Sequence, residues 1–171
     1  MKKLVAALAA LLGASGCGYR VVGAEAESAE PLAVVPAPGV VTSAVAEEGV
    51  VAGARAELAA TGLLASCDPR TDARCPALVI ELMRIEEGGA APGLATRDGP
   101  PLARSVTLTL RGRAFIRRTK DAPPERPGPD LTVREFAARE DDPTRFHATR
   151  EEALRRAGKR LGALLVRRAL E

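Results

Sequence analysis

The side chains best equipped for covalent chemistry in this 171-residue chain are its three cysteines, Cys17, Cys67 and Cys75. Cys17 follows the small residues 14–16 and a short apolar run, 4–12, which begins directly after two lysines. A charged start, a short apolar run and small residues before a cleavage point are typical of a secretory signal. The run is too short to span a bilayer. We therefore expect cleavage after residue 16, so that the mature chain begins at Cys17.

The same arrangement resembles the bacterial lipobox, in which the cysteine thiol is linked to diacylglycerol and the new amino terminus is acylated. The resemblance implies N-acyl and S-diacylglycerol groups on Cys17. Each buried methylene contributes about 0.8 kcal/mol, so these chains would hold the protein at its membrane. Gly18 stands where an aspartate is the usual inner-membrane retention signal in enteric-type bacteria, which implies an outer-membrane lipoprotein on the periplasmic side. The alternative is an ordinary cleaved leader, and Ala14 favours it mildly because leucine is commonest at that position.

Cys67 and Cys75 bracket a polar loop that contains Pro69. An even pair of cysteines in an exported chain predicts a disulfide, and closing so short a loop stabilises a fold by about 2–3 kcal/mol. The alternative is a metal or redox pair. The spacing is not that of a CxxC motif, and the single histidine, His147, is far away in the sequence, so we expect no metal site.

The mature chain has the length of one domain. We divide the chain into a signal peptide (1–16), a lipid-anchored segment with a short acidic spacer (17–31) and a single domain (32–171). The formal net charge of +3 falls to +1 when the two leader lysines are removed, so global charge favours no particular partner. One tyrosine, three phenylalanines and no tryptophan leave few stacking platforms, so we expect no nucleic acid partner.

Alternating apolar residues predict five strands, at 19–23, 32–35, 77–86, 103–118 and 131–138. Helical spacing predicts one helix that is capped by Thr42 or Ser43 and ends near Gly62, and a second that begins near Thr149 in a capping box with Glu152. The order β-β-α-β-β-β-α predicts an α+β fold. We expect a two-layer sandwich in which two helices pack on one face of a mostly antiparallel sheet of four or five strands.

Each predicted helix carries an apolar stripe that should face the sheet. In the first helix the stripe consists of mostly small residues, and Gly49 and Gly53 each cost about 1 kcal/mol relative to alanine. The expected stripes are Val45, Ala52, Ala56, Ala59 and Leu63 in the first helix, and Leu154, Ala157, Leu161, Leu164 and Leu165 in the second.

Several features together resemble the lipopolysaccharide-assembly lipoprotein family, LptE. They are the motif Cys17-Gly18-Tyr19-Arg20, the sequence Arg55-Ala56-Glu57-Leu58 on a helix, two long strands with a returning strand, and a C-terminal amphipathic helix. The resemblance implies a protein that is not an enzyme. Such a protein plugs and helps to assemble the large outer-membrane β-barrel LptD, which inserts lipopolysaccharide into the outer leaflet, and it can bind lipopolysaccharide itself.

Basic side chains gather along and after the fourth predicted strand, three of them on one strand face. Guanidinium groups bind phosphate through two parallel hydrogen bonds, so these residues are candidates for contact with lipid A phosphates. The alternative is a solvated strand face in a chain whose composition favours arginine over lysine. The candidate residues are Arg111, Arg113, Arg117, Arg118 and Lys120.

The sequence holds no catalytic motif of the GxSxG, Walker, HExxH or paired-cysteine type. His147 has Asp141 and Asp142 nearby, yet a single loop histidine before a helix is more often a solvated residue or a cap. We therefore expect no enzymatic activity and no cofactor. The alternative function is that of a lipoprotein adaptor for another envelope machine, such as a peptidoglycan-synthase activator or a secretin pilot. The partner distinguishes the two functions.

Overall fold

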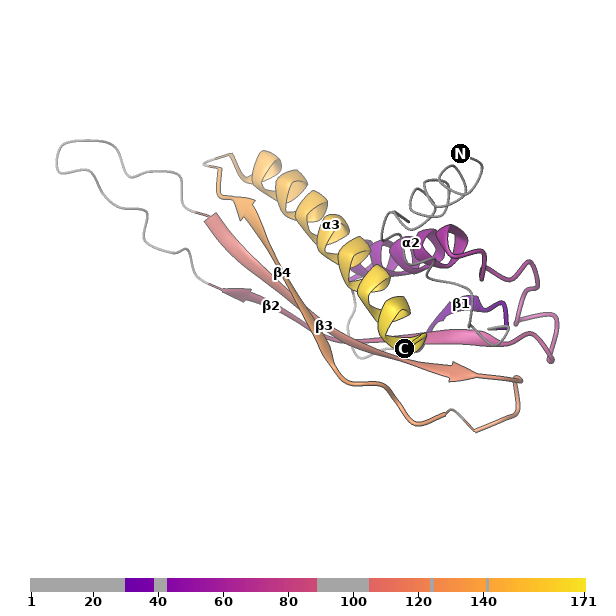
Figure 1. The fold of residues 1–171 in the computed structure, drawn as a ribbon. Helices are drawn as coiled ribbons and strands as arrows, with labels where there is room; N and C mark the ends of the chain where they lie inside the picture. The colour runs from indigo at the N-terminus through magenta and orange to yellow at the C-terminus, as the bar shows by residue number, and fades with distance from the viewer. Residues whose placement is uncertain (1–29, 39–42, 89–104, 124, 141) are drawn as a thin grey trace, which may run out of the picture.

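The computed structural model of the chain describes residues 30–38, 43–88, 105–123, 125–140 and 142–171. Cys17, the predicted signal and the predicted strand at 19–23 lie outside these residues. Four strands and two helices follow one another along the described chain (Figure 1). They are β1 (Ala33–Pro36), α2 (Ala44–Ala60), β2 (Ala77–Gly88), β3 (Ser105–Arg117), β4 (Leu131–Ala138) and α3 (Pro143–Ala169).

The four strands form a single sheet in the order β1-β2-β3-β4. β1 runs parallel to β2 because α2 carries the chain back between them, whereas β2, β3 and β4 pair antiparallel. Both helices lie on the same side of the sheet (Figure 1), where α3 packs against β3 and β4 and α2 packs against β1 and α3. The predicted α+β fold is therefore confirmed.

The core lies between the sheet and the two helices. Leucines from α2, β2, β3 and α3 fill it, and among them Leu78, Leu108 and Leu161 are fully buried. The predicted alternation in the two long strands is confirmed here, because every second residue of β3 from Leu108 to Ala114 is buried on the helix side.

The stripe predicted for the first helix is wrong, because Ala52, Ala56 and Ala59 are exposed. The predicted cap at Ser43 is present, and its hydroxyl accepts a hydrogen bond from the backbone N–H of Ala46. The buried face of α2 lies one residue round the helix from the predicted stripe. It consists of Ala46, Gly49, Val50, Gly53, Ala54 and Leu58.

The physical reason is that α2 packs chiefly on α3, backbone to backbone. A β-carbon added at Gly53 would lie 2.1 Å from the carbonyl oxygen of Lys159, and one added at Gly162 would lie 2.1 Å from that of Val50. Only glycine fits at such distances. The glycines of α2 therefore form the contact between the helices, and their cost in helix propensity is offset by close packing.

The predicted start of the second helix near Thr149 is also wrong. The helix begins at Pro143, and the carboxylate of Asp142 caps it by accepting from the N–H of Thr144 at 2.8 Å. Proline suits the first turn of a helix because its missing N–H has no partner there. Thr149 lies two turns further on, where its hydroxyl donates to the carbonyl of Arg145 at 2.9 Å.

Two further details of α3 differ from the prediction. His147 belongs to the helix and not to a loop, and its Nε2 lies 3.3 Å from Glu151 Oε1 on the exposed side. Leu164 was expected in the buried stripe but is 41% exposed. Gly158, Gly162 and Val166 are buried in addition to the other predicted residues, because α3 contacts α2 as well as the sheet.

A disulfide joins Cys67 to Cys75 in the loop between α2 and β2. Cys75 is buried beside Ala33 and Ala77 in a small second cluster, apart from the main core. The disulfide therefore ties the loop to the first two strands. Within the described part of the chain, no helix is both long and apolar enough to cross a membrane.

Candidate functional site

The face of the sheet opposite the helices carries most of the candidate functional side chains. On β3 the residues that alternate with the buried leucines point to this open face, and they include Arg111, Arg113 and Arg117. The prediction that these three arginines share one strand face is therefore confirmed.

A β-bulge in β2 brings a further arginine to the open face. The pairing of β2 with β3 shifts between Leu82 and Arg84, so that Leu82 lies opposite Gly112 and Arg84 lies opposite Arg111. Met83 is the extra residue, and from there on the alternation of β2 is reversed. Without the bulge, Arg84 would share the helix side with Leu82.

Arg84, Arg111 and Arg134 come from three neighbouring strands and surround one hollow on the open face. Arg84 lies opposite Arg111, and Arg134 lies opposite Thr109, which is two residues before Arg111 on β3. The hollow has a volume of about 180 Å³ and is also lined by Glu86. We call it the arginine hollow.

Carboxylates balance two of these three positive charges. Arg84 Nε lies 2.7 Å from a carboxylate oxygen of Glu86, and Arg111 Nε lies 3.1 Å from Asp130 Oδ2. Among the described residues no carboxylate lies within 4 Å of Arg134. The cluster therefore keeps one net positive charge, and like charges placed directly opposite on neighbouring strands favour an anion between them. A phosphate or carboxylate group is the ligand that guanidinium groups bind best.

The other predicted basic residues do not line the arginine hollow. Arg113 Nε lies 2.7 Å from Glu81 Oε2, and the hydrogen bond and charge of that carboxylate raise the pKa of Arg113. Arg117 lies opposite Ala77 at the end of β3, and its Nε is buried with no hydrogen-bond partner among the described residues. Both residues thus continue the basic row along the open face.

Arg118 and Lys120 lie beyond the end of β3. The guanidinium of Arg118 contacts Glu30 at 3.3 Å and Glu125 at 2.9 Å, and all three side chains are exposed. The backbone N–H of Lys120 donates to the carbonyl of Ala73 in the disulfide loop at 2.8 Å. These two residues therefore stand at the end of the basic row, beside the disulfide loop.

Arg84 and Arg134 were not among the predicted site residues. Simple alternation after Leu82 places Arg84 on the buried face. The only sign to the contrary in the sequence is that the next apolar residue, Ile85, follows Leu82 by three positions and not by two. Such a change is the sequence signal of a bulge. The position of Arg134 beside the hollow depends on the register in which β4 pairs with β3, and the sequence of a single strand does not determine that register.

The acid–base set that His147 could form with Asp141 and Asp142, which we did not expect, is not assembled in the described residues. Asp142 caps α3 and Asp141 lies outside the described residues, while His147 pairs with Glu151 on the exposed helix surface. No group of three or more histidine, cysteine or acidic side chains within the described ranges could hold a metal ion.

No protein-family model and no curated protein matches the chain in sequence. Among solved structures, a minor lipoprotein from Acinetobacter baumannii matches with a TM-score of 0.50 and 14% identity, over 82% of this chain and 90% of that one. The chain shares its fold with a bacterial lipoprotein.

Two further solved structures match less well. A candidate lipoprotein from Caulobacter crescentus CB15 has a TM-score of 0.49 at 15% identity, over 81% of this chain and 87% of its own. Rare lipoprotein B from Shewanella oneidensis has a TM-score of 0.38 at 12% identity, over 77% and 90% of the two chains. At these identities the likeness concerns the fold alone.

Proposed function

We propose that this protein is an envelope lipoprotein that acts in lipopolysaccharide transport at the outer membrane. Acyl groups on Cys17 hold it on the periplasmic side, and the domain serves as plug and assembly partner of an LptD-type β-barrel. It acts by binding and not by catalysis. The lipobox-like leader, the motif Cys17-Gly18-Tyr19-Arg20 and the α+β fold shared with a bacterial lipoprotein support this proposal.

The observation that carries the proposal is the arginine hollow on an uncovered sheet face. Wide outer-membrane barrels have a polar interior, so a domain that plugs one needs a polar surface of its own. Three arginines around one hollow with a net positive charge suit the phosphate groups of lipopolysaccharide. We therefore assign phosphate contact first to Arg84, Arg111 and Arg134, with Arg113 and Arg117 continuing the row.

An exposed aromatic side chain adjoins the arginine hollow. Phe136 lies two residues after Arg134 on β4, opposite Thr107, and is 61% exposed. A cationic hollow next to an apolar ring matches a ligand that carries both phosphate and acyl chains. This combination favours a phosphorylated lipid over a soluble anion.

A titration of the mature chain with lipopolysaccharide tests the binding part of the proposal, with Cys17 replaced by serine to keep the chain in solution. We expect the combined variant Arg84→Gln, Arg111→Gln, Arg134→Gln to bind at least about tenfold more weakly, because each lost hydrogen bond to a charged group is worth about 1.5–3 kcal/mol. The control variant carries Arg145→Gln, Arg155→Gln and Arg168→Gln on α3 and should bind like the wild type. Equal affinity of the two variants would contradict the assignment.

A further inference from the structure

The wall of the arginine hollow includes one negative charge, the carboxylate of Glu86. The register of β2, β3 and β4 arranges the lining side chains in two rows that cross the three strands. The rows are Glu86, Thr109 and Arg134, and next to it Arg84, Arg111 and Thr132. Neighbouring strands lie about 4.8 Å apart, so the backbones of Glu86 and Arg134 are about 10 Å apart at the two ends of one row. An anion held among the three arginines therefore lies close to Glu86.

Glu86 is also bound to one of the three arginines. Its Oε1 lies 2.7 Å from Arg84 Nε, and the two side chains are 48% and 68% exposed. Glu86 follows Arg84 by two positions, so both side chains point to the same face of β2. The ion pair thus lies within the hollow, where both residues form part of the wall. Any anion that binds there competes with this carboxylate for Arg84 and approaches a like charge.

Asp130, the carboxylate partner of Arg111, is placed differently. Arg111 donates to Asp130 Oδ2 from both Nε and Nη2. Asp130 directly precedes β4 and lies near Arg113, whose pKa its charge helps to raise, and it is not one of the residues that line the hollow. Asp130 therefore holds Arg111 from outside the hollow, whereas Glu86 holds Arg84 from inside it.

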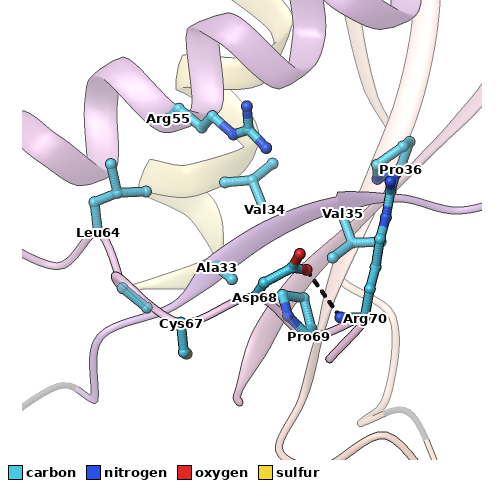
Figure 2. A pocket seen from close by; sticks show the side chains of 11 residues that line it. Ala33, Val34, Val35, Pro36, Arg55, Leu64, Cys67, Asp68, Pro69 and Arg70 are labelled. Carbon is cyan, nitrogen blue, oxygen red and sulfur yellow. Dashed lines mark hydrogen bonds between the residues drawn. The ribbon is translucent and has the colours of Figure 1, made fainter. Parts of the chain in front are cut away.

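A carboxylate beside a hollow does not by itself compete with a ligand, as a second hollow shows. This second hollow has a volume of about 470 Å³ and lies between α2, β1 and the disulfide loop, with Arg55 and Arg70 among the residues around it (Figure 2). Its carboxylate, Asp68, accepts the backbone N–H of Arg70 at 2.9 Å and so belongs to a turn of the loop. Glu86, in contrast, holds a guanidinium group that a ligand would use.

We propose that Glu86 is a built-in competitor that weakens anion binding in the arginine hollow and speeds release of the ligand. Its carboxylate takes the place beside Arg84 that a ligand oxygen would take. A phosphate group can displace it because its oxygens can accept from more than one of the arginines at once. A protein that passes a ligand on must also release it. The inference rests on the proposed function, in which this hollow binds the phosphate of a lipid.

A titration with lipopolysaccharide gives the first test, in the mature chain with Cys17 replaced by serine. Glu86→Gln keeps the shape of the side chain and removes its charge. We expect this variant to bind about two- to fivefold more tightly, as for the loss of one exposed charge interaction, and chiefly through slower dissociation. Glu87→Gln is the matched control. Glu87 is the next residue of β2, lies opposite the buried Leu108 and contacts Arg150 on α3, so the variant loses the same charge outside the hollow and should bind like the wild type.

Inorganic phosphate gives a second test that does not depend on lipopolysaccharide. The NMR signal of the Arg84 Nε–H group should move at an about two- to fivefold lower phosphate concentration in Glu86→Gln than in the wild type, and Glu87→Gln should match the wild type. Equal or weaker phosphate binding in Glu86→Gln would overturn the inference, as would the lack of any phosphate-dependent shift at Arg84. If neither protein binds lipopolysaccharide but phosphate gives the expected difference, the proposed function fails and the role of Glu86 stands.

Discussion

At the scale of single residues, many arginines of this protein are paired with carboxylates, and the arginine hollow combines paired arginines with an unpaired one. Arg111 and Arg113 each have a carboxylate partner on the open face, whereas Arg134 has none among the described residues. Arg167 likewise has a carboxylate partner, Glu57, whereas Arg55 and Arg70 have none among the described residues. A surface arginine needs no partner in water, so it is the convergence of several arginines on one hollow that indicates a ligand.

The pair between Glu57 on α2 and Arg167 on α3 gives a prediction about pH. Arg167 donates to both carboxylate oxygens, at 2.7 and 3.3 Å, and these hydrogen bonds and the guanidinium charge lower the pKa of Glu57. Because the unfolded chain keeps the ordinary pKa near 4.5, it binds more protons in acid than the folded chain. The pair therefore stabilises the fold above that pH, and its contribution is lost as the pH falls through the lowered pKa.

Urea unfolding from pH 7 to pH 3 measures this effect. We expect the wild type to lose more stability than the variant Glu57→Gln over this range, because the glutamine does not titrate. Parallel loss in both proteins would show that the pair contributes nothing to the acid sensitivity.

At the scale of elements, close contact between backbones decides how the helices sit. The four helical glycines Gly49, Gly53, Gly158 and Gly162 lie where α2 and α3 touch. In the sheet the bulge at Met83 has a comparable effect, because it turns Arg84 away from the core. Both features depend on contacts between elements distant in sequence.

The contact between the helices predicts that Gly162→Ala destabilises the protein. The new methyl group would lie 2.1 Å from the carbonyl oxygen of Val50, so the two helices must separate. We expect a loss of about 2 kcal/mol, since overpacking costs more than the roughly 1 kcal/mol that alanine gains in helix propensity. The measurement is urea unfolding. Gly88→Ala is the control, because its β-carbon meets nothing closer than 3.7 Å and should change stability by less than about 0.5 kcal/mol.

The sequence was sufficient to predict those elements that depend on local pattern. The strands around Leu78 and Leu108, the Ser43 cap and the α+β class follow from alternation and capping chemistry. The predictions from sequence were wrong where contacts between distant elements override the local pattern. The face of α2 is set by its glycines, and Thr149 resembles a cap although Asp142 and Pro143 begin the helix earlier. Of the arginine hollow, only Arg111 was predicted, because a bulge and a strand register position the other two arginines.

At the scale of the whole molecule, the helices cover one face of the sheet, and the opposite face is open around the arginine hollow, whereas Ala33 and Ala77 on that face are buried beside Cys75. β1 forms the first edge of the sheet. The disulfide between Cys67 and Cys75 holds the loop that forms one wall of that edge. A small domain with one polar face is suited to bind a larger partner across that face, and the proposed lipid anchor would keep it beside a partner in the same membrane.

Reduction of the disulfide should destabilise the domain by about 2.5 kcal/mol, the chain-entropy value for the eight-residue separation of Cys67 and Cys75. Cys75 is buried, so the loss should not be smaller. The measurement is the urea midpoint with and without reductant, and a variant with both cysteines replaced by serine should show no response to reductant. An unchanged midpoint in the wild type would mean that the loop is held by its other contacts.

The central claim is the partner, and co-purification tests it most directly. The full-length lipidated protein is isolated from detergent-solubilised outer membranes, and the proteins that accompany it are identified by mass spectrometry. We predict a large β-barrel of the lipopolysaccharide-insertion type in a ratio near one to one. A peptidoglycan synthase or a secretin in its place, or the protein alone, would contradict the proposal, and a synthase or secretin would establish the adaptor function.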